Sequence, residues 1–397
     1  MKKLVCVLLV FIAFNVKAQT YSIGGTVTDE KGATVSGATV FLTNSKYVTS
    51  TDNAGKFSFN KLQSGSYEVV IKMAGFIAVT QSVIVQEKPV YLSIRLKASN
   101  TILNSVTIRG RPDPKREEYL AQFIKNFIGE TVNAQHCKIL NPEVLSFHYN
   151  KTTKFLTASA DDFIVVENKA LGYRLKYLLT KFELDINNYI CGIIGSLYFE
   201  DLKGTAAEQK KWANNRRITY LSSSRHFFRA VMNNTTKAEG YLVYQNINDP
   251  AIITAVHKGS PAEIIEFYQT APTGKIKRYA VKISDVNSLF IDDKKNFKTL
   301  KKDVARLGLL IIYTGQKQSP LFYKTGQSYN LPIPLPAKQR RNMQVSQIIS
   351  LMDVVTIDKN YEWLAKGFRY SGYWSWLRTA DLVPIDYFVN PLDEKKQ

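Results

Sequence analysis

The sequence predicts a mainly β protein with an α+β second part: an N-terminal seven-stranded β-sandwich, followed by a larger β-dominated domain. Two observations support this fold class. Strand-like segments recur about every eight to twelve residues between positions 21 and 98, separated by turns rich in glycine and aspartate. Beyond position 141, segments of alternating polarity dominate again and are interrupted by a few helical stretches.

The chain begins with a segment typical of an export signal. A basic start precedes an apolar run from Leu4 to Phe14, and the small residue Ala18 predicts cleavage before Gln19. The run of about eleven residues is too short to span a bilayer, which takes about twenty, and no later stretch is long and apolar enough. We therefore expect a signal peptide at 1–18 and a mature protein in the periplasm or associated with the outer membrane, without a transmembrane segment.

Composition limits the classes of partner. A hydrophobic content of 45% with 12% aromatic residues favours folded cores over disorder. The formal net charge of +20 favours anionic partners through long-range attraction, which in an envelope are lipid headgroups, acidic glycans or an acidic protein. Export and the lack of a nucleic-acid motif argue against nucleic acid. The alternative is that the basic surface only aids solubility.

The segment 21–98 is expected to form the sandwich. Apolar residues at alternate positions from Tyr67 to Ile71 give one strand an apolar face, and 79–96 supplies the last strands. Asp29–Gly32 and Asp52–Gly55 are turn signals, because an aspartate side chain accepts hydrogen bonds from nearby backbone amides and glycine takes a positive φ.

These strands and turns resemble the carboxypeptidase regulatory-like domain, a transthyretin-like sandwich. The positions that carry the resemblance are Gly25, Val27, Asp29, Gly32, Val35, Gly37, Ala38, Val40, Thr51, Asp52, Gly55, Phe57, Leu62, Gly65, Tyr67, Val69, Gly75 and Phe76. The resemblance is to an accessory module and implies no peptidase activity.

The histidines agree with this reading. Metallocarboxypeptidases hold zinc with a His-x-x-Glu pair and a third histidine, but none of His136, His148, His226 and His257 has a glutamate three positions later. We expect no metal, no other cofactor and no carboxypeptidase activity.

Similar sandwiches open the TonB-dependent outer-membrane transporters of Bacteroidota. Leu103–Gly110 is similar to the extended segment that follows the sandwich there, although a further strand or an ordered linker explains it as well. About 290 residues remain, too few for a plug and a large barrel. Arg111–Pro114 breaks the strand pattern, so we assign 99–114 to a linker.

The segment 115–390 is expected to form a β-rich α+β domain. The predicted helices are Lys115–Ile128, Ala206–Asn214 and Ser222–Asn233, and the predicted strands include Leu145–Tyr149, Tyr173–Leu179, Tyr189–Phe199 and Arg278–Ile283. Several strings resemble a domain of unknown function that follows such sandwiches in exported Bacteroidota proteins. They lie at Glu167–Tyr173, Arg217–Arg229 and Gly372–Pro384. That family implies no activity.

The clearest group of polar residues is the run from Ser222 to Arg229. In one interpretation a serine of the run Ser222–Ser224 caps a helix, while Arg225 and Arg229 face water or an anion. An anion-binding turn would combine Ser223, Arg225, His226 and Arg229 near the helix start. A serine hydrolase with His226 as base and Asp381 as orienting acid is a weaker alternative, because Gly-x-Ser-x-Gly is absent.

A second group is aromatic. Tyr373, Trp374 and Trp376 either stack on sugar rings or a protein partner if exposed, or form part of a core if buried; we favour burial. Arg378 can pair with Asp381 and fix this segment.

Two cysteines follow the signal. Export permits a disulfide between Cys137 and Cys191, and the alternative is two small buried residues.

Taken together, the sequence predicts a non-enzymatic exported envelope protein. It would act as an adaptor or accessory subunit that binds an outer-membrane protein complex or an anionic lipid or glycan surface. The alternative is a glycan-binding protein that uses Trp374 and Trp376, and a hydrolase centred on His226 is the third hypothesis.

Overall fold

The computed structural model describes residues 21–86, 88–99, 114–248, 264–271, 274–293, 297–333, 343–358, 360 and 367–389. Residue contacts divide the chain into two compact units. The first comprises Met1–Val40 and Thr49–Asn100, and the second comprises Phe41–Val48 and Thr101–Gln397. The expected signal peptide and nearly all of the expected linker lie outside the described residues. Among the helices that are described, none has the length and apolar character to cross a membrane.

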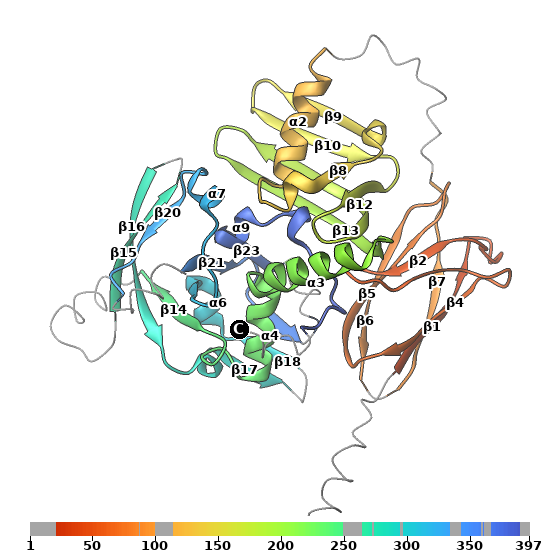
Figure 1. Cartoon of the computed structure of the whole chain (residues 1–397). Helices are drawn as coiled ribbons and strands as arrows, with labels where there is room; N and C mark the ends of the chain where they lie inside the picture. Colours follow the sequence, from red (N-terminus) through yellow and green to blue (C-terminus); the bar gives the residue numbers. More distant parts are fainter. Residues whose placement is uncertain are drawn as a thin grey trace, which may run out of the picture. The chain divides into compact units, whose positions relative to one another are not determined.

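Seven strands form the two sheets of the sandwich, which Figure 1 draws in red and orange. One sheet has the order β4-β1-β7, and the other has the order β3-β2-β5-β6. The strands are β1 Tyr21–Thr28, β2 Thr39–Leu42, β3 Val48–Ser50, β4 Lys56–Leu62, β5 Gly65–Lys72, β6 Val79–Val85 and β7 Val90–Arg95. The predicted seven-stranded sandwich is confirmed.

The turns of the first unit form as their residues predict. The Asp29 carboxylate accepts hydrogen bonds from the amides of Lys31 and Ala33 at 2.9 and 2.8 Å. The Asp52 carboxylate does the same for the two amides at positions 54 and 56. Gly55 has a φ of +70°, and a Cβ there would lie 2.5 Å from the carbonyl oxygen of Val27. Only glycine fits this turn without strain.

The second unit begins with a six-stranded sheet and one helix. Helix α2 (Arg116–Phe127) contributes Phe123 and Phe127 to the buried core on one face of this sheet. The strands are β8 Cys137–Ile139, β9 Leu145–Asn150, β10 Phe155–Ala160, β11 Ile164–Asn168, β12 Tyr173–Asp185 and β13 Ile190–Asp201. Their order is β8-β11-β12-β10-β9, with β13 paired to the other side of β12.

Two more sheets follow in the second unit. A seven-stranded sheet has the order β20-β15-β16-β14-β19-β21-β23, and a three-stranded sheet has the order β17-β18-β22. Their strands are β14 Tyr241–Ile247, β15 Ile264–Ala271, β16 Gly274–Ile283, β17 Phe290–Asp293, β18 Phe297–Leu300, β19 Leu309–Tyr313, β20 Ser328–Asn330, β21 Gln344–Ser350, β22 Val355–Asp358 and β23 Phe368–Gly372. The predicted β-dominated α+β second part is confirmed.

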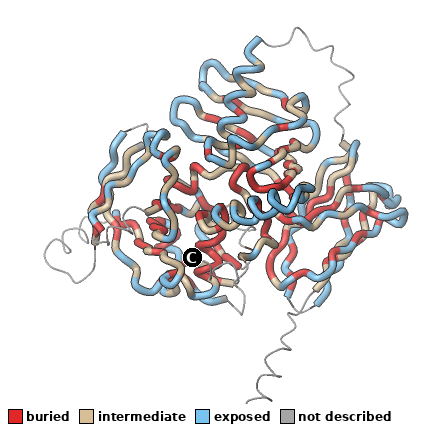
Figure 2. The backbone as a smooth tube through the Cα atoms, in the orientation of Figure 1, coloured by how far each residue is buried: buried red, intermediate tan, exposed pale blue. Residues whose placement is uncertain are grey.

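Two adjacent helices differ sharply in burial. Helix α3 (Ala206–Leu221) is longer than the predicted Ala206–Asn214 and is largely exposed, whereas α4 (Ser224–Asn233) is buried over most of its length, as Figure 2 shows. Phe227, Phe228 and Val231 of α4 lie in a core with β14, β19 and β22. The remaining helices are short: α6 Lys302–Leu307, α7 Pro320–Tyr323 and α9 Tyr373–Trp376.

Candidate functional site

The connection between α3 and α4 places the predicted serine cap. Ser223 has extended backbone angles, and its hydroxyl accepts a hydrogen bond from the amide of His226 at 3.2 Å. This satisfies one of the amides that a helix start leaves unpaired, so the predicted serine cap is confirmed, with Ser223 as the capping residue.

The prediction that Arg225 and Arg229 face water or an anion is wrong. Both residues are buried, with exposed fractions of 6% and 7%. The Arg225 guanidinium donates to the carbonyl oxygen of Val383, and the Arg229 guanidinium donates to those of Ile385 and Tyr387, the latter at 2.7 Å. Burying a guanidinium is costly unless its N–H groups find acceptors, and these carbonyls accept hydrogen bonds from terminal nitrogens of both side chains. The two arginines therefore hold the C-terminal segment and are not open to an anion.

His226 lies in a buried polar cluster. Its Nε2 pairs with the Glu239 carboxylate, and its Nδ1 lies 2.7 Å from the Tyr241 hydroxyl and 3.0 Å from the carbonyl oxygen of Leu221. Only 4% of the His226 surface is exposed. With both ring nitrogens engaged by neighbours, the histidine ties the end of α3 to α4 and β14.

Burial and hydrogen bonding act in opposite directions on Glu239. Burial alone would raise the pKa of its carboxyl, but hydrogen bonds from His226 and Thr235, together with the charge of His226, lower it. Burial raises the pKa of Tyr241 well above its ordinary value. These shifts keep Glu239 charged and Tyr241 neutral over the physiological range.

The residues proposed for a serine hydrolase are engaged elsewhere. The Ser222 hydroxyl donates to the side chain of Gln316, and Ser223 donates to the carbonyl oxygen of Tyr220 at 2.6 Å. Asp381 accepts hydrogen bonds from Thr131 and Asn133. The described contacts thus do not assemble Ser222, His226 and Asp381 into a triad.

The aromatic group is buried, as the favoured interpretation predicted. Tyr373, Trp374 and Trp376 have exposed fractions of 5%, 7% and 8%. The Trp374 indole packs on Phe227 and donates to the carbonyl oxygen of Ser222 at 3.1 Å. Tyr373 and Trp376 instead form a small cluster with Phe322 of α7. A sugar ring cannot stack on side chains that are covered in this way, so the predicted glycan platform is not present.

Arg378 and Asp381 meet through the main chain. The backbone amide of Arg378 donates to Asp381 at 3.4 Å, while Thr131 and Asn133 donate at 3.1 and 2.9 Å. Burial raises the pKa of Asp381 to about 6, although these three hydrogen bonds lower it in part. Because the pKa of Asp381 is higher in the folded state than in the unfolded chain, the free energy of unfolding falls as the pH rises toward neutral.

Replacing Asp381 with asparagine should change how stability depends on pH. The folded state favours protonated Asp381, so the wild type should lose about 3 kcal/mol as the pH rises from about 4 to about 6, whereas D381N should not. Denaturant unfolding at several pH values measures the difference. Asp161, an exposed carboxyl, is the matched control. A D381N profile parallel to that of the wild type would contradict the assignment.

Of the two alternatives for the cysteines, the disulfide is wrong, because Cys137 and Cys191 are free and partly buried. Strand register places Cys137 level with Tyr173 of β12 and Cys191 level with Leu184, about 36 Å apart along an extended strand. A disulfide needs Cα atoms within about 7 Å. Burial, with the charge of Asp381, raises the pKa of Cys137 to about 12, so its thiol stays protonated and unreactive.

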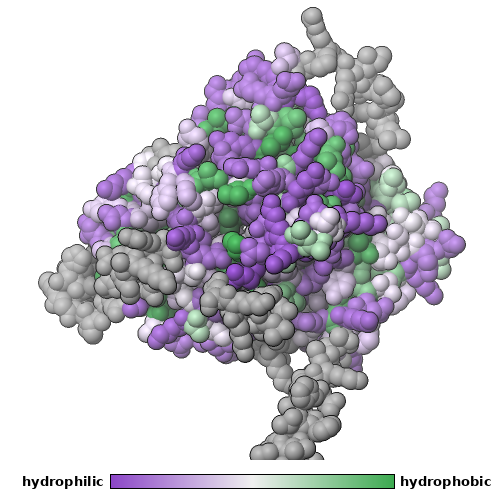
Figure 3. Space-filling view, in the orientation of Figure 1, coloured by the Kyte–Doolittle hydropathy of each residue, from purple (hydrophilic) through white to green (hydrophobic). Residues whose placement is uncertain are grey.

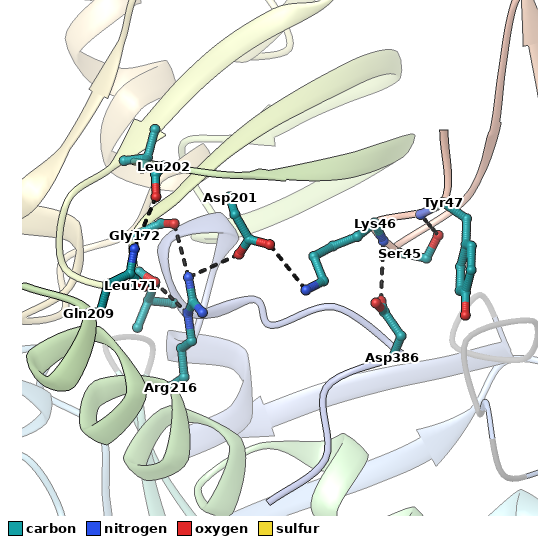
Figure 4. Close-up of polar contacts among 10 residues, drawn as sticks. All are labelled: Ser45, Lys46, Tyr47, Leu171, Gly172, Asp201, Leu202, Gln209, Arg216 and Asp386. Atoms are coloured by element: carbon teal, nitrogen blue, oxygen red, sulfur yellow. Dashed lines mark hydrogen bonds and ion pairs between the residues drawn. The ribbon is translucent and has the colours of Figure 1, made fainter. Parts of the chain in front are cut away.

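The turn between β2 and β3, within Phe41–Val48, forms an isolated β-bridge on the outer edge of β13. Ser45 pairs in parallel with Tyr198, the Asn44 amide donates to Leu197, and the Phe199 amide donates to Ser45 at 2.8 Å. Lys46 reaches Asp201 at 3.2 Å, and Arg216 of α3 reaches the same carboxylate at 3.3 Å, as Figure 4 shows. The outer edge of β13 thus already exchanges backbone hydrogen bonds with another part of the chain at Leu197 and Phe199.

The same edge continues without a partner toward the start of β13. Among the described residues no backbone group pairs with the outer edge from Ile190 to Gly195. Ile190 and Ile194 are 56% and 45% exposed, and the stretch carries no charge. The sequence pattern predicts a strand here but does not indicate that it is an edge. Figure 3 shows a mainly hydrophilic surface with separate apolar patches. An uncharged apolar edge is unusual, because native proteins mostly protect free edges.

Comparisons with known proteins give one family match and several partial structural similarities. Solved structures that resemble part of the chain include 3-chlorocatechol 1,2-dioxygenase from Rhodococcus opacus 1CP, with 10% identity, 22% of this chain and 62% of that chain covered, and a TM-score of 0.19. A type II cohesin–X-dockerin complex from Acetivibrio cellulolyticus has 22% identity, with 20% of this chain and 58% of that chain covered and a TM-score of 0.18. A putative carbohydrate binding protein from Bacteroides uniformis ATCC 8492 has 12% identity, with 40% of this chain and 57% of that chain covered and a TM-score of 0.18.

These similarities are partial. Each spans less than two thirds of the other chain, and the low TM-scores support no inference about activity. No curated protein matches the chain. The family comparison is more specific, because residues 22–97 match the carboxypeptidase regulatory-like domain, in agreement with the strands and turns described above. The N-terminal sandwich is therefore a carboxypeptidase regulatory-like domain.

Proposed function

We propose that this protein is a non-enzymatic accessory protein of the cell envelope that binds a protein partner by strand addition at β13. The observation that carries the proposal is the unpaired, uncharged edge from Ile190 to Gly195, next to a stretch of the same edge that already holds Asn44 and Ser45. An accessory role is consistent with the carboxypeptidase regulatory-like domain. The envelope location rests on the predicted export signal.

The chemistry of the edge indicates the kind of partner. In strand addition, main-chain hydrogen bonds supply affinity, and alternate side chains supply specificity. Ile190 and Ile194 lie on the exposed face, while Cys191 and Ile193 pack toward the buried core. The expected partner is an extended segment with apolar residues opposite Ile190 and Ile194 and no charge between them. Proteins that keep an edge free usually protect it with lysine or proline, and this stretch has neither.

The test places a lysine on the edge of β13, as proteins do where they prevent strand addition. Ile194→Lys should reduce recovery of the partner about tenfold, because an incoming strand would have to desolvate the lysine. Ile218→Lys, on the exposed face of α3, is the matched control, since its side chain is 44% exposed and that of Ile194 is 45%. Tagged wild-type and variant proteins would be purified from native envelopes in mild detergent, and the co-purifying proteins quantified by mass spectrometry.

A second readout locates the partner on the edge. Amide hydrogen exchange from Ile190 to Gly195 should slow in the complex, because strand addition pairs the outward amides. A partner retained equally by the I194K protein, or exchange unchanged in this stretch, would contradict strand addition at β13. Recovery of the wild type alone would contradict the accessory role as a whole.

A further inference from the structure

A turn in the second unit exposes apolar side chains. At the end of β21 and in the turn before β22, Ile349, Leu351, Met352 and Val354 have exposed fractions of 36%, 55%, 54% and 62%. We call these four residues the apolar loop. Isolated exposed apolar residues are ordinary, but four within six positions concentrate apolar surface in one place.

Part of the backbone of the apolar loop is paired. The Leu351 amide donates to the carbonyl oxygen of Gly367 at 2.7 Å, and the Met352 amide donates to the Ser350 hydroxyl at 3.1 Å. The same hydroxyl donates to the carbonyl oxygen of Met352. An unpaired backbone group is costly in an apolar medium, so these bonds lower the cost of moving Leu351 and Met352 out of water.

The apolar loop is fixed to the core at its base. Val355 and Ile357, which follow it, are 1% and 0% exposed and pack with Ile348 and Leu300. The exposed side chains are thus presented from a rigid support, with the larger apolar residues at the tip of the turn.

Exposed cations surround the apolar loop. Arg369 pairs with Ile349 across β21 and β23, and Gly308, two residues after Arg306, lies against Ile349. Lys301 and Lys302 lie at the start of α6, which packs on β21. Among the described residues of this region, the exposed charged ones are Lys301, Lys302, Asp303, Arg306, Asp353 and Arg369. Lys302 and Asp353 form an ion pair at 4.0 Å, which leaves three cations and one carboxylate, so these described side chains are net positive.

We infer that the apolar loop and these cations bind the surface of an anionic lipid bilayer. The four apolar side chains would enter the headgroup region, and Lys301, Arg306 and Arg369 would contact lipid phosphates. Apolar burial and attraction to anionic lipid are the two contributions that hold peripheral proteins at membranes. The net positive charge beside exposed apolar residues complements an anionic lipid surface, which argues for lipid as the occupant. The inference is independent of strand addition at β13.

The test measures co-sedimentation of the full mature protein with vesicles. Wild type should sediment with phosphatidylcholine vesicles that contain about 30 mol % phosphatidylglycerol, but not with phosphatidylcholine alone, and raised salt should release it. Leu351→Ser with Met352→Ser should weaken binding about tenfold or more, because the inserted apolar area is lost. Ile276→Ser, at an apolar residue 45% exposed on β16, should bind like the wild type.

Two further variants separate the contributions. Arg306→Gln with Arg369→Gln should weaken binding and reduce its salt dependence, and circular dichroism would verify that each variant is folded. Equal binding of the wild type to neutral and anionic vesicles, or no binding to either, would overturn the inference. So would a double-serine variant that binds like the wild type. Light scattering that shows a dimer lost in that variant, without vesicle binding, would identify the apolar loop as a contact between two copies instead.

Discussion

Replacing Arg229 with alanine is expected to lower the free energy of unfolding by about 4 kcal/mol, since two hydrogen bonds from a buried charged donor contribute about 1.5–3 kcal/mol each. The carbonyl oxygens of Ile385 and Tyr387 would lose their donor, and the guanidinium would no longer lie over the rings of Tyr220 and Phe388. Urea unfolding of the wild type and the R229A protein measures the loss.

Amide hydrogen exchange distinguishes release of the C-terminal segment from a loss of stability throughout the protein. The amide of Ile385 donates to Asn44 at 2.7 Å and should exchange faster in the R229A protein, because the segment that carries it is released. Lys210→Ala, at an exposed position of α3, should stay within about 0.5 kcal/mol of the wild type. An R229A protein within about 1 kcal/mol of the wild type would show that the arginine does not anchor the C-terminal segment.

Replacing Gly172 with alanine should be nearly as damaging, with an expected loss of about 3 kcal/mol. Its φ is +68°, which costs other residues about 1–2 kcal/mol. A Cβ there would also lie 2.2 Å from the indole ring of Trp212, and overpacking of this kind adds about 1–3 kcal/mol. Trp212 cannot move freely, because its Nε1 donates to the carbonyl oxygen of Lys169 at 2.9 Å.

Gly192 provides the control for Gly172. It has no positive φ, and a Cβ there would meet no atom within 4 Å, so Gly192→Ala should be neutral or slightly stabilising. Thermal unfolding of both variants measures the contrast. Equal melting temperatures for the G172A and G192A proteins would show that α3 adjusts to the added methyl group.

Much of the first unit could be predicted because its signals are local. The apolar alternation of β5, the aspartate turns and the positive φ of Gly55 each depend on a few neighbouring residues. The Ser223 cap was predictable for the same reason, since its partner amide is three residues away.

The contacts that define the candidate site are not local. Arg229 is bonded to carbonyls more than 150 positions later in the chain, and the partner of His226 is Glu239 on the next connection, not the predicted Asp381. Neither pairing produces a characteristic spacing of residues that could be recognised in the sequence. A buried arginine and a solvated one look alike in sequence, because carbonyl acceptors belong to every residue type.

The membership of Phe41–Val48 in the second unit has a consequence for dissecting the chain. A fragment that ends before the 99–114 segment would carry Phe41 without the rings of Phe163 and Tyr198, which lie 5.8 and 5.0 Å from it. A fragment that starts after that segment would lack Asn44 and Ser45, so the outer edge of β13 would also lose its hydrogen bonds at Leu197 and Phe199. The domain boundary seen in the sequence is thus a poor place to divide the gene for separate expression. A chimaera in which another sandwich replaces this one would have to keep Phe41–Val48 to cover the edge of β13.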